Sequence, residues 1–262
     1  MRVAIIGAAG RMGQAIVRSL ELEGVTLVGA VEHGESKALG RDAGEVAGAG
    51  TLGVEISPDL GSALLGADCV IDFSSPRALS TVVQVASQRK IAFVSGTTGI
   101  DAGAEAALDA AAKSIPVLWS PNMSVGVHVL ADLVKRAIAM LGPGFDVEIV
   151  ESHHRLKTDA PSGTAKRLFE AVKEARSSSR ALSGREGIVG KRTDDEVAIL
   201  ALRGGDVVGD HTVHLLGAGE RIELTHRATS RDLFARGALR AAIALHKKSP
   251  GRYTMADIVE SP

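Results

Sequence analysis

Short apolar runs alternate with amphipathic segments along the first half of the chain. The runs fall at residues 3–6, 25–31, 67–73, 91–94 and 117–119. Between them, apolar residues recur at helical spacing in segments 14–20, 77–88 and 102–113. Repeated alternation of strand and helix predicts a parallel sheet with right-handed crossovers. Residues 34–60 are rich in Gly, Ala, Ser and Asp and are predicted to form a loop.

The pattern changes after a helix predicted at residues 126–141. Strands are predicted near 146–152, 195–203, 206–216 and 220–228, with one long helix at 165–176 between the first two. This order indicates an open, mostly antiparallel or mixed sheet, and hence a second domain. Residues 177–194 are predicted to form a long mobile loop. A helix at 231–246 and a last element at 253–259 are expected to return to the first domain.

The expected fold class is therefore α/β. A Rossmann-like dinucleotide-binding domain, residues 1–124 plus 234–262, is expected to carry a second α+β domain built on an open mixed sheet, residues 125–233.

A glycine-rich turn follows the first predicted strand. Gly7, Gly10 and Gly13 lie between a strand and a helix, which is the context of the first turn of a dinucleotide-binding unit. Gly10 would let the backbone approach a pyrophosphate, and Gly13 would let the helix pack on the sheet. The strict fingerprint is not met, because Ala8 and Ala9 flank the position of the expected second glycine.

Polar residues end the other predicted strands of this half. Glu32 follows the second strand, where an acid is expected to bind a ribose hydroxyl, and His33 would assist a 2′-phosphate only weakly. Gly, Ser, Thr and Asn cluster at 72–75, 95–99 and 120–124. Each cluster alone is typical of a turn, but ligands bind beyond the carboxyl ends of parallel strands. Together the clusters predict a crevice.

The richest chemistry lies in residues 151–165, between a predicted strand and a predicted helix. His153, His154, Arg155 and Lys157 fall there, followed by the turn Ser162-Gly163-Thr164. Pro161 suits a first helical turn, and Asp159 or Ser162 could cap the helix. Amides near Gly163 and Thr164 would then face an anion. The alternative is that these residues form a solvent-exposed cationic surface and that the histidines have no function. The combination of a proton donor, positive charge and anion-binding amides instead favours a site for a small anionic molecule.

Composition narrows the class of protein. With 30 basic against 31 acidic residues the net charge is −1, which argues against nucleic acid as the main partner. Cys69 is the single cysteine, so neither a disulfide within the chain nor a cysteine zinc site is expected. Met1 leads directly into a strand pattern, so no signal peptide is expected. The apolar runs are shorter than the ~18 residues of a membrane span, so a cytoplasmic protein without membrane contact is expected.

The remaining histidines do not suggest a metal. His211, His214 and His226 fall in strand patterns, and a metal site would want ligands that converge with a carboxylate. His153 and His154 are adjacent and would point to opposite faces of an extended chain. The prediction is no metal site.

Seven segments together resemble one known family over essentially the full length. They are G-A-A-G-R-M-G at 7–13, I-D-F-S at 71–74, G-T-T-G at 96–99, P-N-M-S-V-G-V at 121–127, E-S-H-H-R-L-K-T-D-A-P-S-G-T-A at 151–165, G-D-V-V-G-D-H-T at 205–212 and E-R-I-E-L-T-H-R-A at 220–228. The chain resembles the dihydrodipicolinate reductases, also called 4-hydroxy-tetrahydrodipicolinate reductases. The segment at 151–165 is highly specific for that family, whereas the glycine turn is not.

The resemblance implies reduction of 4-hydroxy-tetrahydrodipicolinate with NADH or NADPH in diaminopimelate and lysine biosynthesis. It implies that His153 and Lys157 are catalytic, with Lys157 described as proton donor. The substrate, a small dicarboxylate, would be held by His154, Gly163, Thr164 and Thr98. The implied cofactor-binding residues are Gly7, Ala8, Ala9, Gly10, Arg11, Met12, Glu32, His33, Phe73, Gly96, Thr97, Thr98, Ser120, Pro121, Asn122 and Met123. Asp72, Phe73 and Ser74 would border the nicotinamide.

The resemblance also implies a homotetramer built through the open sheet of the second, substrate-binding domain. The departures from the family pattern are few. His33 stands where members that use NADPH well often carry arginine, Leu156 replaces a residue that is often polar, and His128 stands where asparagine is common.

Two further expectations follow from the residues. Arg155 and Lys157 would disfavour the protonated form of His153 until an anionic substrate binds. A hinge closure is expected near residues 123–126 and 230–235. Two other functions stay open: another NAD(P)-linked two-domain dehydrogenase, acting on an amino-acid semialdehyde or sugar, and a non-catalytic NAD(P)-binding regulator that would tolerate Lys157→Ala.

Overall fold

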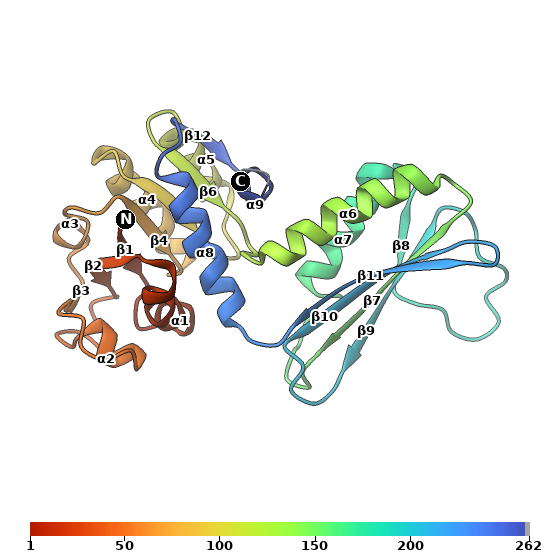
Figure 1. Cartoon of the computed structure of the whole chain (residues 1–262), viewed down its shortest axis with the longest axis horizontal. Helices are drawn as coiled ribbons and strands as arrows, with labels where there is room; N and C mark the ends of the chain where they lie inside the picture. The colour runs from red at the N-terminus through yellow and green to blue at the C-terminus, as the bar shows by residue number, and fades with distance from the viewer. Residues whose placement is uncertain (260–262) are drawn as a thin grey trace. The chain divides into compact units, whose positions relative to one another are not determined.

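The computed structural model describes residues 1–259 and divides into two compact units (Figure 1). The first unit comprises Met1–Val125 together with the chain from Asp232 onward, and the second comprises Gly126–Arg231. The second unit is therefore inserted into the sequence of the first. The predicted junctions, at 124/125 and 233/234, differ from these by one and two residues.

A seven-stranded sheet forms the centre of the first unit. From one edge to the other its strands are β12 (Gly251–Tyr253), β6 (Pro116–Trp119), β5 (Ala92–Ser95), β4 (Cys69–Asp72), β1 (Arg2–Ile6), β2 (Thr26–Val31) and β3 (Ile56–Ser57). All the pairings are parallel. The chain builds outward from β1 in one direction and then from β4 in the other, so the topological switch point lies between these two strands. The predicted Rossmann-like sheet is confirmed.

Helices cover both faces of this sheet, which explains the continuous apolar runs. Core residues on one face come from α1 (Arg11–Ser19), α2 (Ala43–Ala47), α8 (Asp232–Leu245) and α9 (Met255–Val259), and on the other from α4 (Pro76–Gln88) and α5 (Ala102–Ala112). Along β1, Val3 and Ile5 pack in the first of these cores, whereas Ala4 and Ile6 pack in the second. Because successive strand residues point to opposite faces, both sets must be apolar.

The prediction that residues 34–60 form a loop is wrong. This segment contains α2, β3 and the start of α3 (Leu60–Ala63), and the short 3-10 helix η1 (Glu21–Glu23) precedes it. Asp42 caps α2: its Oδ1 accepts hydrogen bonds from the backbone N–H groups of Gly44 and Glu45, at 2.8 and 3.1 Å. Elements this short do not complete the periodic pattern by which helices and strands are predicted.

The second unit is a mixed five-stranded sheet with helices on one face (Figure 1). Its strand order is β11 (Arg221–Ala228), β10 (Gly209–Leu216), β7 (Asp146–His153), β9 (Glu196–Arg203) and β8 (Arg180–Leu182). The pairings of β10 with β7 and β11 are antiparallel, and those of β9 with β7 and β8 are parallel. The expectation of an open mixed sheet is therefore confirmed.

The two long helices of this unit, α6 (Val125–Leu141) and α7 (Gly163–Ala175), pack on the same face of the sheet. Leu130 and Leu168 join Val147, Ile149 and Val213 in one buried core. Alternate residues of the strands point to the other face, where Leu200 and Leu202 are 41% and 57% exposed. Within residues 1–259, no helix is both long and apolar enough to cross a membrane.

Two local predictions in this unit require correction. Residues 177–194 are not wholly a loop, because β8 lies within them and pairs with β9. Helix α7 begins at Gly163, and Ser162 is its cap: Ser162 Oγ accepts a hydrogen bond from the N–H of Ala165 at 3.1 Å. Pro161 therefore precedes the cap and does not form the first turn. Asp159 does not cap the helix.

Candidate active site

A cavity of about 370 Å³ lies in the first unit, beyond the carboxyl ends of β1, β4, β5 and β6. Its lining residues are Gly10, Arg11, Met12, Phe73, Ser74, Gly96, Thr97, Thr98, Pro121, Met123 and Phe234. All of these except Ser74 and Phe234 belong to the predicted cofactor-binding set, and Ser74 was expected to border the nicotinamide. Phe234 was missed, because in sequence it is only an apolar residue early in a predicted helix.

The other predicted cofactor-binding residues shape the turns around this cavity. The N–H groups of Gly7 and Ala8 donate to the carbonyl oxygen of Val31, at 2.9 and 3.1 Å. The N–H of Ala9 donates to Oε1 of Glu32 at 2.9 Å, and His33 is exposed beside it. At the end of β6, Ser120 Oγ donates to the carbonyl of Asn122 at 2.7 Å, and Asn122 Oδ1 accepts from the N–H of Ser124 at 2.8 Å.

The residues present fit a dinucleotide. Helix α1 starts at the cavity with Gly10 as its N-cap, and no side chain caps it. The amides of its first turn therefore have no side-chain competitor for a pyrophosphate. Glu32, at the end of β2, stands where an acid binds a ribose hydroxyl.

A buried carboxylate organises one wall of the cavity. Asp72 is fully buried at the end of β4, and its oxygens accept hydrogen bonds from the hydroxyls of Ser74, Ser95 and Thr97, at 2.5, 2.8 and 2.9 Å. Trp119 Nε1 donates to the carbonyl of Thr97 at 2.8 Å. Neighbouring strand ends are thereby held together, and Thr97 is fixed against the cavity.

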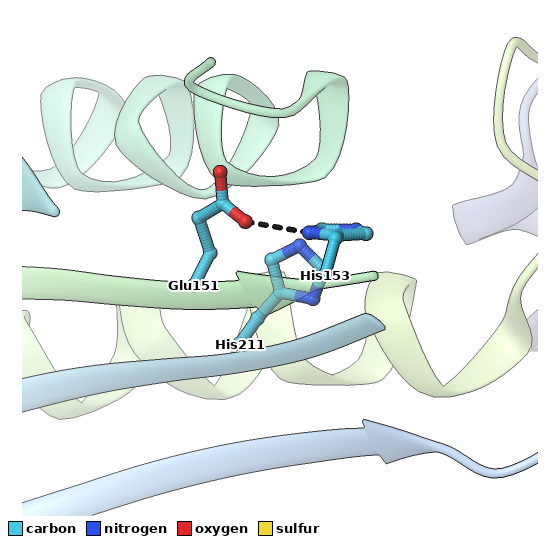
Figure 2. A group of neighbouring side chains, drawn as sticks. All are labelled: Glu151, His153 and His211. Atoms are coloured by element: carbon cyan, nitrogen blue, oxygen red, sulfur yellow. Dashed lines mark hydrogen bonds and ion pairs between the residues drawn. The ribbon is translucent and has the colours of Figure 1, made fainter. Parts of the chain in front are cut away.

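The second unit carries the predicted catalytic histidine at the end of β7. His153 is 8% exposed, and its Nδ1 lies 2.5 Å from Oε2 of Glu151, which is fully buried (Figure 2). The two residues lie on the same face of the strand, because they are two positions apart. The sequence patterns gave Glu151 no role, although it opens the specific segment.

Arg203 approaches the same carboxylate from the neighbouring strand. Residue 203 is the register partner of His153 in the parallel pairing of β9 with β7. Its Nη1 lies 2.9 Å from Oε2 of Glu151, and its Nη2 lies 2.8 Å from Oε1. This two-pronged ion pair was also missed, because an arginine at a strand end has no local signal for a partner 52 positions away.

His211 completes the group from β10. Its ring stands edge-on to that of His153, with centroids 5.1 Å apart, and it lies behind His153 in Figure 2. Its Nε2 is 3.0 Å from Oγ of Ser162, the residue that caps α7. The sequence patterns placed His211 only in a strand and gave it no role in the site.

Glu151, His153 and His211 bring three atoms that can bind a metal within 4.8 Å of one another. A carboxylate therefore converges with two of the histidines, which the sequence patterns did not indicate. The donor set nevertheless does not fit a cation, because both oxygens of Glu151 already accept hydrogen bonds from the permanently charged Arg203. That no metal binds here stays a prediction.

The loop after β7 carries the other predicted residues. Lys157 Nζ lies 2.7 Å from Oδ1 of the exposed Asp159. His154 Nε2 lies 3.3 Å from a guanidinium nitrogen of Arg231, which the sequence did not single out. Gly163, at the start of α7, is exposed, and a Cβ added to it would meet no heavy atom within 4 Å. Room for a ligand therefore lies in front of this helix start, next to Thr164.

The surroundings set the protonation of this group. Burial lowers the pKa of His153, and Lys157 and Arg203 lower it further, against the opposing effect of Glu151. Burial acts to raise the pKa of Glu151, but the hydrogen bonds from Arg203 and His153 outweigh it and hold that pKa below its usual value. Burial lowers the pKa of His211 to about 4, so this ring is neutral near pH 7. Arg155, expected to act on His153, is exposed, and Arg203 acts instead.

A doubly wound parallel sheet with a cavity beyond its strand ends, in the same chain as a mixed sheet bearing a histidine and a lysine, defines a two-domain oxidoreductase that uses a nicotinamide dinucleotide. Family models narrow this class. Residues 1–123 match "Dihydrodipicolinate reductase, N-terminus" and residues 126–259 match "Dihydrodipicolinate reductase, C-terminus". The chain belongs to the dihydrodipicolinate reductase family.

The names of individual relatives agree with this family. A protein of Anaeromyxobacter dehalogenans (strain 2CP-1), named 4-hydroxy-tetrahydrodipicolinate reductase, is 52% identical over 262 residues, which cover 98% of this chain and 97% of the relative. A protein of the same name from Syntrophotalea carbinolica is 49% identical, with coverage of 99% and 98%. Among solved structures, the dipicolinate-bound dihydrodipicolinate reductase from Paenisporosarcina sp. TG-14 shares the fold, with a TM-score of 0.76, 23% identity and 97% coverage of both chains.

Proposed function

We propose that this chain reduces 4-hydroxy-tetrahydrodipicolinate to tetrahydrodipicolinate with NADH or NADPH and with loss of the 4-hydroxyl group as water, a step of diaminopimelate and lysine biosynthesis. Relatives that are about 50% identical over nearly the whole chain are named for this activity. The observation that carries the proposal is the loop of the second unit, where His153, Lys157 and the open start of α7 follow one another within the most specific segment of the family.

The cavity of the first unit is proposed as the cofactor site. When bound, the nicotinamide supplies a hydride to the unsaturated ring of the substrate. Phe73 and Thr97 line the cavity that would orient the ring of the cofactor, and the amides at the start of α1 would hold its pyrophosphate.

The second unit is proposed to hold the substrate and to supply the proton. Gly163 and Thr164, at the positive end of the α7 dipole, would bind a carboxylate, with His154 and Lys157 adding polar and cationic groups. Lys157 and the free ring nitrogen of His153 are the candidate proton donors. An anionic substrate would offset the cations that now lower the pKa of His153 and so favour its protonated form.

A homotetramer in the cytoplasm is proposed for the active protein. The uncovered face of the second sheet exposes Leu200 and Leu202 beside the half-buried Val150. An apolar sheet face of this kind is covered in most proteins, and a second copy of the chain is the expected cover.

The activity is tested by cofactor oxidation at 340 nm. The purified protein receives the condensation product of aspartate semialdehyde and pyruvate, with NADH and NADPH in separate assays. Oxidation that depends on this product, and that falls at least about 100-fold in Lys157→Ala, is expected from the loss of a proton donor. Cofactor binding without turnover would indicate a regulator, and turnover of a different semialdehyde or sugar would indicate another dehydrogenase.

A further inference from the structure

Every hydrogen-bonding position of one buried carboxylate in the second unit is occupied. Oε2 of Glu151 lies 2.5 Å from His153 Nδ1 and 2.9 Å from Arg203 Nη1. Oε1 lies 2.8 Å from Arg203 Nη2 and 3.1 Å from the backbone nitrogen of Ser162. Two acceptor interactions at each oxygen account for the four lone-pair directions of an ionised carboxylate.

This arrangement determines which nitrogen of His153 carries a proton in the neutral ring. Arg203 and the amide of Ser162 can only donate, so Glu151 acts as an acceptor and its low pKa keeps it ionised. Nδ1 of His153 must then donate, and Nε2 is the nitrogen left to exchange a proton with a ligand. Space beside Nε2 exists because residue 209 is glycine: an added Cβ would lie 3.0 Å from this atom.

The same carboxylate reaches the start of α7. Ser162 donates its N–H to Glu151, and its Oγ both accepts from the N–H of Ala165 and lies 3.0 Å from Nε2 of His211. The helix start that faces the proposed substrate carboxylate and the ring that faces the proposed proton acceptor are therefore fixed to one side chain.

We propose that Glu151 is a positioning residue for the proposed reduction, and that Arg203 is its partner. Glu151 orients His153 with Nδ1 protonated and Nε2 free, and it holds the helix start at Ser162 in register with that ring. Arg203 keeps the carboxylate ionised so that the proton stays on the histidine. The inference rests on the proposed function, because it assigns His153 a proton-transfer role in that reaction.

The charged and titratable groups near His153 come from three strands and one loop. Glu151 on β7 favours its protonated form, whereas Lys157 on the following loop and Arg203 on β9 oppose it. His211 on β10 is adjacent and uncharged near neutral pH. Removal of the charge of Glu151 therefore shifts the titration of His153 to lower pH.

The test compares Glu151→Gln with Glu148→Gln in the 340 nm assay. Glu148 lies on the same strand, points to the opposite face and is held by Arg192 at 3.1 Å, so it controls for loss of a half-buried carboxylate–arginine pair. Glu151→Gln is expected to lower kcat about 10- to 100-fold and to move the basic limb of the kcat profile to lower pH, with an unchanged KM for NADH. Glu148→Gln is expected to retain both kcat and the profile. An unchanged pH profile and kcat in Glu151→Gln would overturn the inference.

A second measurement does not depend on the folding of a variant. The protein labelled with ¹⁵N at histidine reports the tautomer of each ring, and a His153→Gln sample assigns the resonance. We expect His153 to carry its proton on Nδ1 in the wild-type protein. A proton on Nε2 of the neutral ring would overturn the inference even if Glu151→Gln is inactive.

The two proposals fail separately. If the wild-type protein reduces the substrate and Glu151→Gln is equally active, the positioning role is wrong and the function stands. If the wild-type protein reduces nothing, the function is wrong, and the ¹⁵N spectrum still decides whether Glu151 fixes the tautomer. Arg203→Lys retains the charge but not the two-pronged contact, and it should reduce kcat less than Glu151→Gln does.

Discussion

The backbone N–H of Ala9 donates to Oε1 of Glu32 at 2.9 Å, which joins the glycine turn after β1 to the end of β2. The carboxylate is thus fixed beside the turn that would hold the pyrophosphate. A second hydrogen bond, from the N–H of His33 to Oε2 at 3.3 Å, leaves the imidazole of His33 exposed. A fixed negative charge at this position favours a ribose hydroxyl over a 2′-phosphate.

Replacement of His33 by arginine should therefore shift cofactor use toward NADPH. A guanidinium beside Glu32 would offset its charge and pair with the 2′-phosphate, and the KM for NADPH should fall about three- to tenfold while that for NADH changes little. Steady-state kinetics with both cofactors measure the shift. Glu35→Gln, in the same loop, raises the net charge equally. An equal gain in that variant would show a general field effect in place of a local contact.

The close approach of Gly96 to Phe73 leads to a second prediction about the cofactor site. A Cβ on residue 96 would lie 2.2 Å from the ring of Phe73, so Gly96→Ala must displace a ring that lines the cavity. We expect cofactor affinity to fall at least about tenfold, as measured by quenching of protein fluorescence or by calorimetry. Gly99→Ala is the control, because the nearest atom to its added Cβ is 4.0 Å away, although its φ of +73° makes the change mildly strained. Normal affinity in Gly96→Ala would contradict the importance of this contact.

Ligand binding should raise the pKa of His153. In the free protein burial, Lys157 and Arg203 lower this pKa, and a dicarboxylate beside Lys157 adds negative charge that favours the protonated ring. An NMR titration of the ring, with and without pyridine-2,6-dicarboxylate, is expected to move its midpoint to higher pH by about one unit or more. Identical titration curves would exclude the coupling between substrate charge and proton supply.

The stability of the protein should decline as pH falls, partly through His211. Its folded pKa of about 4 is below its unfolded value near 6.5, so the unfolded chain takes up the proton first. This contribution is complete above pH ~6.5 and is lost progressively toward pH 4. Between pH 7.5 and 5 the loss should amount to about 2 kcal/mol. Urea unfolding at both pH values should show a smaller loss in His211→Gln, since glutamine retains a partner for Ser162 and does not titrate. The pKa values of His153 and His226 are also lowered, but both residues are present in both proteins, so their contributions to the stability change cancel in the comparison.

The exposed sheet face predicts the state of assembly. Leu202→Glu places a charge on the face proposed to bind another copy, and the tetramer should dissociate into smaller species in sedimentation velocity. Met140→Glu, on α6 and 86% exposed, is the matched control and should leave assembly unchanged. A wild-type protein that sediments as a monomer would refute the tetramer directly.

Most of the fold could be predicted because its elements are long or fully buried. The apolar runs of β1, β4 and β5 are continuous since both faces of their sheet are covered, and α4 and α7 repeat at helical spacing. The elements that were missed, α2, β3 and β8, have two to five residues. Their position is fixed by contacts such as the cap at Asp42 and the pairing with β9, which come from distant parts of the chain.

The residues of the candidate site also differ in how far the sequence could predict them. His153, Lys157 and the start of α7 lie within fifteen residues, so sequence alone could group them. Arg203 and His211 belong to other strands, and only the register of β9 and β10 against β7 brings them to Glu151. Register depends on pairing across the sheet, which no local pattern encodes.

The insertion of the second unit between two parts of the first has a consequence for synthesis of the chain. Helix α8 supplies Leu239 and Leu245 to the core around β1, and β12 completes the edge of that sheet beside β6. As the ribosome releases the chain, the parallel sheet therefore lacks part of its core until residues 232–258 have emerged. Residues 126–231 are contiguous and are all released earlier, so they can fold during translation while the dinucleotide-binding unit is still incomplete.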